Sequence, residues 1–169
     1  MITKSRLITI VSLICIFLCA CACEKTFLQK TAVGSRILAF TFDGSVARSR
    51  TLRPSAFAYK TEDELLVEAW VGHGIAYSVK LTIPSASAGE GVTLSPEVEF
   101  EYIYRRKGGY DITREATVDA ATMYIRRLDY EKRIFAGDFT MKGSYIDSTG
   151  VVHRFNVTDG VFDLVLKDL

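Results

Sequence analysis

The sequence predicts an all-β fold, either an antiparallel β-sandwich or a flattened β-barrel of about nine strands. Apolar residues alternate with polar residues at a period of two, which is typical of strands that are buried on one face. Short clusters of Gly, Asp, Ser and Thr separate these alternating segments, as turns require. Hydrophobic residues make up 49% of the chain and charged residues 24%, so a packed core is expected rather than disorder.

Three segments carry the clearest alternation. Between residues 75 and 83, every second side chain is large and apolar, and small or polar residues lie between them. The same holds between residues 97 and 105, and again between 135 and 145, where glycines share the apolar face. The apolar positions are Ile75, Tyr77, Val79, Leu81 and Ile83, then Val98, Phe100, Tyr102 and Tyr104, then Phe135, Phe139, Met141 and Tyr145. Strands are therefore expected near 34–42, 55–60, 64–71, 74–83, 97–106, 119–129, 133–147, 150–157 and 160–167.

Turn residues connect the expected strands. Asp43-Gly44 predicts a hairpin, because both residues tolerate positive φ. Asp159-Gly160 predicts a turn between the last two strands, and residues 84–96 predict a surface loop. Residues 115–130 also place apolar side chains at helical spacing, so a single helix there remains an alternative.

The N-terminus predicts export. Two positive charges, Lys4 and Arg6, precede twelve mostly apolar residues at 7–18, which fits a signal peptide better than a spanning helix of ~20 residues. Leu18-Cys19-Ala20-Cys21 resembles the lipobox of bacterial lipoproteins, in which the cysteine is acylated and becomes the first residue. That resemblance implies lipidation at Cys21, with Cys23 as the alternative. A plain secretory signal is the other interpretation.

The positions of the cysteines and the charge balance limit the kinds of site that the folded domain can contain. All four cysteines lie within the first 23 residues, so no internal disulfide or thiolate site is expected beyond them. Removal of Lys4 and Arg6 leaves 19 basic and 20 acidic residues, a balance that does not favour nucleic-acid binding. The expected organisation is a signal peptide at 1–20, an acylated N-terminus and tether at 21–33, and one β-rich domain at 34–169.

Several short motifs resemble a known group of proteins. They are Phe-Thr-Phe-Asp-Gly at 40–44, Ala-Tyr at 58–59 followed by 65–70, the strand at 134–141, and the closing strand at 158–163. Together the mature chain resembles small β-rich lipoproteins of Bacteroidetes-type bacteria, a group of unknown function. The resemblance implies anchoring in the cell envelope, at the outer membrane, and favours a strand at 119–129. It implies no activity.

The polar residues do not predict an active site, and no catalytic, cofactor or metal residues are assigned. Two histidines, His73 and His153, are expected to have structural roles. Glu97, Glu99 and Glu101 share one strand face about 7 Å apart. That spacing overlaps the carboxylate pairs of inverting glycosidases, so a carboxylate-based hydrolase is a minor alternative to a solvated face.

The turn at residues 147–150 is expected to need no metal. Its sequence, Asp-Ser-Thr-Gly, could suggest a calcium loop, but the spacing of an EF-hand is missing. An Asp that closes a tight turn through its side chain accounts for these residues.

Aromatic residues are the main candidates for contact with a partner. Trp70 shares a strand face with Glu64, Leu66 and Glu68, while Tyr110, Tyr124 and Tyr130 lie near strand ends or turns. Exposed rings of this kind contact glycans or partner proteins, although packing into the core is the favoured interpretation.

The leading functional hypothesis is a non-enzymatic binding or structural module, held on the membrane by its lipid. The alternative is a lipocalin-like barrel that carries a small apolar ligand. The interior of the domain distinguishes the two hypotheses. A carrier keeps an internal cavity for its ligand, whereas the core of a scaffold is filled by side chains.

The lipobox generates the first testable prediction. Mass spectrometry of the mature N-terminus should find an acylated Cys21, because Leu18 and Ala20 occupy the positions that the peptidase prefers. Cys21→Ala should move acylation to Cys23 or leave the precursor uncleaved. An unmodified soluble product of the unaltered chain would contradict lipidation.

Overall fold

The structure is a computed structural model that describes residues 34–49, 55–73, 75–105, 111–147 and 149–169. The chain divides into two compact units, Met1–Thr31 and Ala32–Leu169. The first unit, with the expected signal peptide and both Cys21 and Cys23, lies outside the described residues. No helix in the described ranges has the length and apolarity needed to cross a membrane.

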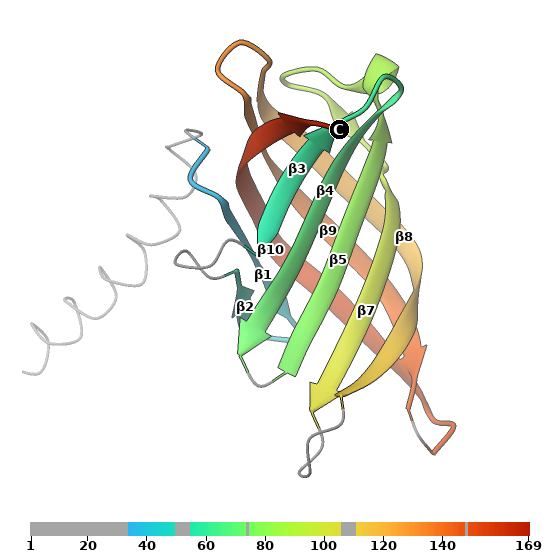
Figure 1. Cartoon of the computed structure of the whole chain (residues 1–169). Helices are drawn as coiled ribbons and strands as arrows, with labels where there is room; N and C mark the ends of the chain where they lie inside the picture. The colour runs from blue at the N-terminus through green and yellow to red at the C-terminus, as the bar shows by residue number, and fades with distance from the viewer. Residues whose placement is uncertain (1–33, 50–54, 74, 106–110, 148) are drawn as a thin grey trace, which may run out of the picture. The chain divides into compact units, whose positions relative to one another are not determined.

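Seven strands form a closed barrel, which confirms the predicted all-β fold (Figure 1). Each strand pairs antiparallel with the next around the barrel. A parallel pairing of the last strand with the first closes the circuit, with Leu166 opposite Ala58. In barrel order the strands are β3 (Ala56–Lys60), β4 (Glu64–His73), β5 (Ile75–Pro84), β7 (Glu97–Arg105), β8 (Asp111–Asp129), β9 (Ile134–Ile146) and β10 (Val152–Asp168).

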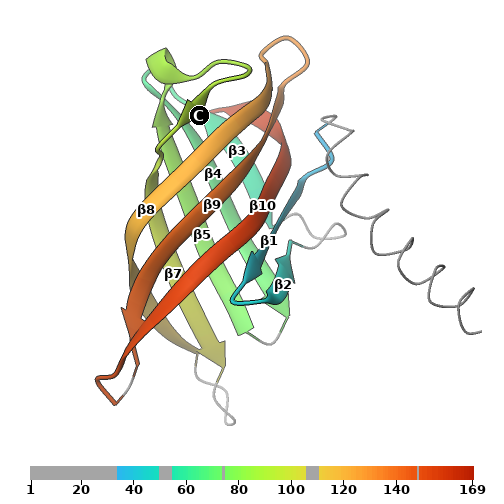
Figure 2. The ribbon, with the colours of Figure 1, turned by 180° about the vertical axis from the view of Figure 1, so that it is seen from behind.

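Three further strands and one short helix complete the wall. β1 (Ile37–Phe42) and β2 (Ser45–Arg48) form a hairpin that pairs with β10 (Figure 2). The predicted turn at Asp43-Gly44 is confirmed, with φ of 44° and 83°. The expected loop at 84–96 instead contains a 3-10 helix, η1 (Ser85–Ser87), and β6 (Thr93–Leu94), which pairs with β8.

The prediction of two separate strands at 150–157 and 160–167 is wrong, because β10 runs through both ranges. Asp159-Gly160 forms a bulge, and the pairing with β9 shifts between Val157 and Gly160. Asp159 has a φ of 52° there. A Cβ at Gly160 would collide with the carbonyl oxygen and ring of Phe139, so a glycine is needed for close approach rather than for chain reversal.

The helix alternative at 115–130 is also wrong. This range belongs to the long strand β8, which pairs with β9 along most of its length. Met123 and Ile125 are buried while Tyr124 between them is exposed, which is the period of a strand. β8 begins at Asp111, well before the predicted start at 119.

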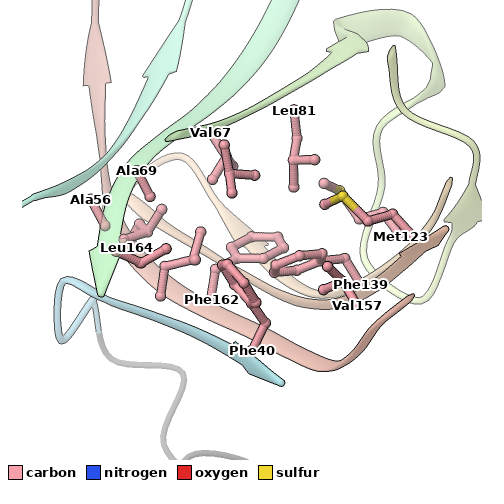
Figure 3. Packing of buried hydrophobic residues seen from close by; sticks show 14 of the residues in the cluster. Phe40, Ala56, Val67, Ala69, Leu81, Met123, Phe139, Val157, Phe162 and Leu164 are labelled. Carbon is pink, nitrogen blue, oxygen red and sulfur yellow. The ribbon is translucent and has the colours of Figure 1, made fainter. Parts of the chain in front are cut away.

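The predicted core face of β5 is confirmed where its side chains are described. Tyr77, Val79, Leu81 and Ile83 are buried, and β5 pairs with β7 as expected, with Val79 opposite Phe100. The side chains of Ile75 and Tyr104 lie outside the described ones. Figure 3 shows labelled members of this core, such as Leu81, Met123 and Phe162, which point inward from different strands of the barrel.

This assignment of faces predicts the effect of four substitutions. Val79→Ala and Phe100→Ala should each lower the free energy of unfolding by about 1–4 kcal/mol, because both side chains are buried. Lys80→Ala and Glu99→Ala should change it by less than about 0.5 kcal/mol, since they remove only an exposed ion pair. Denaturant melts measure all four variants. Larger losses for the charged positions would reverse the assignment.

Candidate functional site

The interior of the barrel is filled by aromatic rings at the level of Phe42. This residue comes from β1, and its ring lies 5.4 Å from the ring of Phe155 and 5.9 Å from that of Phe100. Phe100 on β7 also lies 5.1 Å from Phe155 on β10. These two strands are not neighbours in the wall, so rings from separate parts of the barrel meet across the middle.

Two glycines on β9 make room for these rings. A Cβ at Gly143 would collide with the ring of Phe155, and a Cβ at Gly137 would collide with the ring of Phe162. The sequence places both glycines on the apolar face of β9, as predicted. The missing side chains leave room for the rings of Phe155 and Phe162 to approach the backbone of β9 closely and occupy the interior.

One part of the wall is less complete. The β7–β8 pairing ends at Phe100 opposite Ala116, and the edge of β8 is next paired by β6, with Leu94 opposite Met123. Between these points the inward-facing residues Val98, Val118 and Ala121 are only half-buried against the core. We call this stretch the β7–β8 seam.

The turn after β9 is organised by Asp147. Its Oδ1 accepts hydrogen bonds from the backbone N–H groups of Thr149 and Val151 and from the Thr149 hydroxyl. Its Oδ2 lies 2.7 Å from Nε2 of His153. The bonds from the Thr149 hydroxyl and His153 hold the pKa of the Asp147 carboxyl well below its usual range. The predicted Asp-closed turn is therefore confirmed.

His153 belongs to a ladder of rings at this end of the barrel. Its imidazole stacks on Tyr145 at 5.2 Å, and Tyr145 stacks on Tyr102 at 5.3 Å. Burial, followed by nearby charges, raises the pKa of Tyr145, and burial raises the pKa of Tyr77 beside the ladder to about 12. Both phenols therefore stay protonated at neutral pH. His153 is half-buried and ordered by packing, which fits the structural role predicted for it.

The glutamate row on β7 is a solvated face. Glu97 and Glu99 are exposed and Glu101 is half-buried on the outside of the barrel. Nζ of Lys80 on β5 lies 2.6 Å from Oε1 of Glu99, and this bond raises the pKa of Lys80. Glu99 and its neighbours lie on an open sheet face, which does not enclose a substrate between two carboxylates. The row therefore adds no support to the hypothesis of a carboxylate-based hydrolase.

The candidate contact residues lie outside the core wherever they are described. Trp70 is 56% exposed, Tyr130 47% and Tyr124 42%, so the favoured interpretation of core packing is wrong for all three. The alternation of β4 explains Trp70, because Leu65, Val67 and Ala69 take the inward positions. Tyr110 lies outside the described residues, as does the side chain of His73.

The outer face that bears Trp70 also bears aromatic residues that the sequence did not single out. Tyr59 on β3 lies opposite Leu66 on β4, on the outer face that also bears Phe57 and Trp70. Nζ of Lys167 lies 4.7 Å from the ring centre of Phe57 and 5.9 Å from that of Tyr59. We define the Trp70 face as Phe57, Tyr59, Leu66, Glu68, Trp70 and Lys167. The alternation of residues 56–60 predicts that Phe57 and Tyr59 share one face. Nothing in the local sequence predicts the parallel pairing of β10 with β3, which brings Lys167 to that face.

Tyr124 lies on a different part of the outer wall. It is paired with Thr93 on β6 and with Asp138 on β9. Nε of Arg126 lies 3.0 Å from Oδ2 of Asp138. Burial raises the pKa of Asp138 while Arg126 opposes that effect. This Tyr124 face, made of Tyr124, Arg126 and Asp138, combines a ring with a half-buried ion pair.

Tyr130 follows the end of β8 and pairs with a lysine of another strand. Nζ of Lys60, the last residue of β3, lies 4.6 Å from the ring centre of Tyr130. Thus Trp70 lies on β4, Tyr124 lies on β8, and Tyr130 follows β8 and contacts the last residue of β3. Within the described ranges, no group of three or more His, Cys, Asp or Glu side chains is arranged to hold a metal ion.

Comparison of the chain with protein-family models, with curated proteins and with solved structures gives no match. The resemblance to Bacteroidetes-type lipoproteins therefore stays a prediction from the sequence.

The Asp147 turn generates a pH-dependent prediction. Because the folded state lowers the pKa of this carboxyl, its contribution to stability is present above the unfolded pKa of about 4 and is lost as the pH falls below it. Asp147→Asn should therefore be less stable than the unaltered protein near neutral pH, and the difference should shrink in acid. Denaturant melts at a series of pH values measure it.

Asp119→Asn provides a matched control, because Asp119 is exposed on β8. Its stability difference from the unaltered protein should be small near neutral pH. A difference for Asp147→Asn that stays constant down to low pH would contradict the role given to the carboxylate.

Proposed function

We propose that this protein is a lipid-anchored, non-enzymatic binding module of the bacterial cell envelope, and that it binds through the outside of its barrel. The observation that carries this proposal is the division of its aromatic residues. Rings fill the interior, where Phe100 and Phe155 meet at 5.1 Å, while Trp70 and Tyr124 project outward. A filled barrel is a rigid scaffold, and rigid scaffolds present binding residues on their surface.

The Tyr124 face has the chemistry to contact a protein or glycan partner. An exposed tyrosine ring offers an apolar surface to a sugar ring or a partner side chain. Arg126 and Asp138 next to it supply charged hydrogen-bonding groups, which are already held in place by their ion pair. Thr122 and Thr140, paired on the same outer wall, add exposed hydroxyls.

The start of the domain is suited to an anchored protein. The buried carboxylate of Asp163 accepts hydrogen bonds from the backbone N–H groups of Gly34 and Ser35, at 2.7 and 3.1 Å, and from the Ser35 hydroxyl at 2.6 Å. These bonds fix the first described residues to β10. A tether that enters at Gly34 would therefore hold the barrel at a defined point.

The β7–β8 seam supports a second candidate, the lipocalin-like carrier of an apolar ligand. Val98, Val118 and Ala121 face inward yet are half-buried, at the place where the β7–β8 pairing is interrupted. A single acyl chain entering there would contact only apolar side chains. The ring contacts of the interior make this the weaker of the two candidates.

Site-specific photo-crosslinking tests the leading proposal. A photoreactive amino acid in place of Tyr124 in the full-length protein should give a crosslinked protein or glycan in growing cells, because this ring lies on the proposed contact face. The matched control is Glu62, which is exposed in the turn between β3 and β4. Equal crosslinking at both positions would contradict a specific contact at Tyr124.

Titration with a fluorescent fatty acid separates the two candidates. The scaffold should show no saturable binding, since rings occupy the middle of the barrel. Saturable binding that is lost in Val118→Trp, with Tyr124→Trp as the control, would favour the carrier and overturn the leading proposal.

A further inference from the structure

We propose that the Trp70 face docks on the surface of the lipid bilayer, so that the barrel rests on the membrane along β3 and β4. This inference rests on the proposed lipid anchor, and it goes further by assigning an orientation. Three independent features support it: the place where the chain enters the barrel, the chemistry of the Trp70 face, and the distribution of charge around the wall.

The chain enters the barrel beside the Trp70 face. Gly34 and Ser35 are hydrogen-bonded to Asp163, and Gly34 packs against the side chain of Val165. Val165 and Lys167 are two residues apart on the same strand, about 7 Å, and Lys167 belongs to the Trp70 face. Figure 2 shows the first described residues lying next to β10. The point of entry is therefore continuous with the proposed docking surface.

The length of the tether keeps this side of the barrel near the membrane. Twelve residues lie between Cys21 and Gly34, so the chain makes thirteen residue-to-residue steps from one to the other. A fully extended chain of that length spans at most about 45 Å, and a flexible chain spans much less on average. With the acyl chains of Cys21 in the bilayer, the flank at Gly34 is the part of the barrel that the anchor holds closest. A docking surface on this flank meets the membrane without any large rotation.

The chemistry of the Trp70 face is that of a membrane interface. Trp and Tyr are enriched where hydrocarbon meets the headgroups, because each ring has an apolar body and a polar group. Trp70 is 56% exposed, and Phe57 and Tyr59 are half-buried on the same outer face, opposite Glu68 and Leu66. Nζ of Lys167 lies over the rings of Phe57 and Tyr59, and the residue is exposed, so the rings carry a positive charge at the level of the headgroups.

The charge distribution favours this orientation on an anionic surface. Exposed acidic groups gather on the next part of the wall, where Glu97, Glu99 and Glu101 line β7. Glu68 lies on the Trp70 face itself, opposite Phe57, and Lys80 lies opposite Glu68 on β5. Anionic lipids attract Lys167 and repel the glutamate row, so the Trp70 face meets an anionic surface more favourably than β7 does. The barrel therefore tilts with β3 toward the membrane and β7 away from it.

The orientation leaves the Tyr124 face accessible. In the barrel order, β8 is separated from β4 by β5 and β7 on one side, and by β9, β10 and β3 on the other. The two strands are thus on opposite sides of the closed wall. A membrane at Trp70 leaves Tyr124 directed into the aqueous space, where a partner can reach it.

The single tryptophan of the chain makes the test direct. The acylated full-length protein is reconstituted in vesicles of phosphatidylethanolamine and phosphatidylglycerol, with or without brominated acyl chains. Brominated chains should quench Trp70 and its emission should be shifted to the blue. The matched control is the double variant Trp70→Phe with Tyr124→Trp, which moves the only tryptophan to the opposite wall. Its fluorescence should be unaffected by bromination.

A charge variant tests the lysine contribution. Lys167→Glu replaces one positive charge by a negative one and should reduce the ratio of docked to undocked protein about tenfold on anionic vesicles. The effect should vanish on phosphatidylcholine vesicles. An unchanged quenching on anionic vesicles would overturn the electrostatic part of the proposal.

The outcomes separate docking from anchoring. Protein that floats with the vesicles but shows no quenching of Trp70 overturns the docking and leaves the lipid anchor standing. Protein that does not float with the vesicles overturns the anchor and the docking with it. A Trp70 emission that depends on protein concentration in detergent, without quenching by brominated lipid, assigns this face to a second copy of the chain and overturns membrane docking.

Discussion

The barrel depends on the pairing of β10, the strand that closes it. One edge of β10 pairs with β9 from Val152 to Val165, and the other edge is divided between β1 and β3. The parallel contact with β3 covers only Leu166 to Asp168, so the β1–β2 hairpin has to complete the wall beside the rest of the strand. The bulge at Asp159 and Gly160 lets β10 follow the curvature that both partners require. Removing that bend would separate the closing contact from the hairpin.

Because side chains fill the interior of the barrel, residues that contact a partner have to lie on its outer surface. Glycines at 137, 143 and 160 bring rings close to the backbone, and those rings then span the barrel. Interior residues can vary only within the volume that the rings leave, because packed cores tolerate little change in size. The outer wall has no such constraint. It can carry an aromatic face at Trp70, an acidic row on β7 and a ring beside an ion pair at Tyr124 without any cost to the core.

Local periodicity predicted the long strands and their inward faces, and turn residues predicted the Asp43-Gly44 hairpin, because each depends on neighbouring residues alone. The short strands β2 and β6 were missed. The prediction from local sequence failed at Asp159-Gly160. The same two residue types suit a turn and a bulge, and pairing with the partner strand β9 decides which of the two forms. For Trp70 the alternation was right, since Leu65 and Val67 are buried on the opposite face, and only the expectation that aromatic rings pack into the core failed. The neighbours of Trp70 could not be predicted, since Lys167 reaches Phe57 through a parallel contact more than a hundred residues away in sequence.

The carboxylate of Asp163 holds the first described residues against β10, and its burial strengthens this restraint. The residue is 3% exposed, and a carboxylate at that depth is costly unless donors surround it. Gly34 and Ser35 supply three of those donors. If this segment moved away, the carboxylate would lose these three hydrogen bonds, so the entry segment and β10 are held together. A membrane tether that continued from this point would therefore restrict how the barrel turns, and the outer faces would keep a fixed relation to the bilayer.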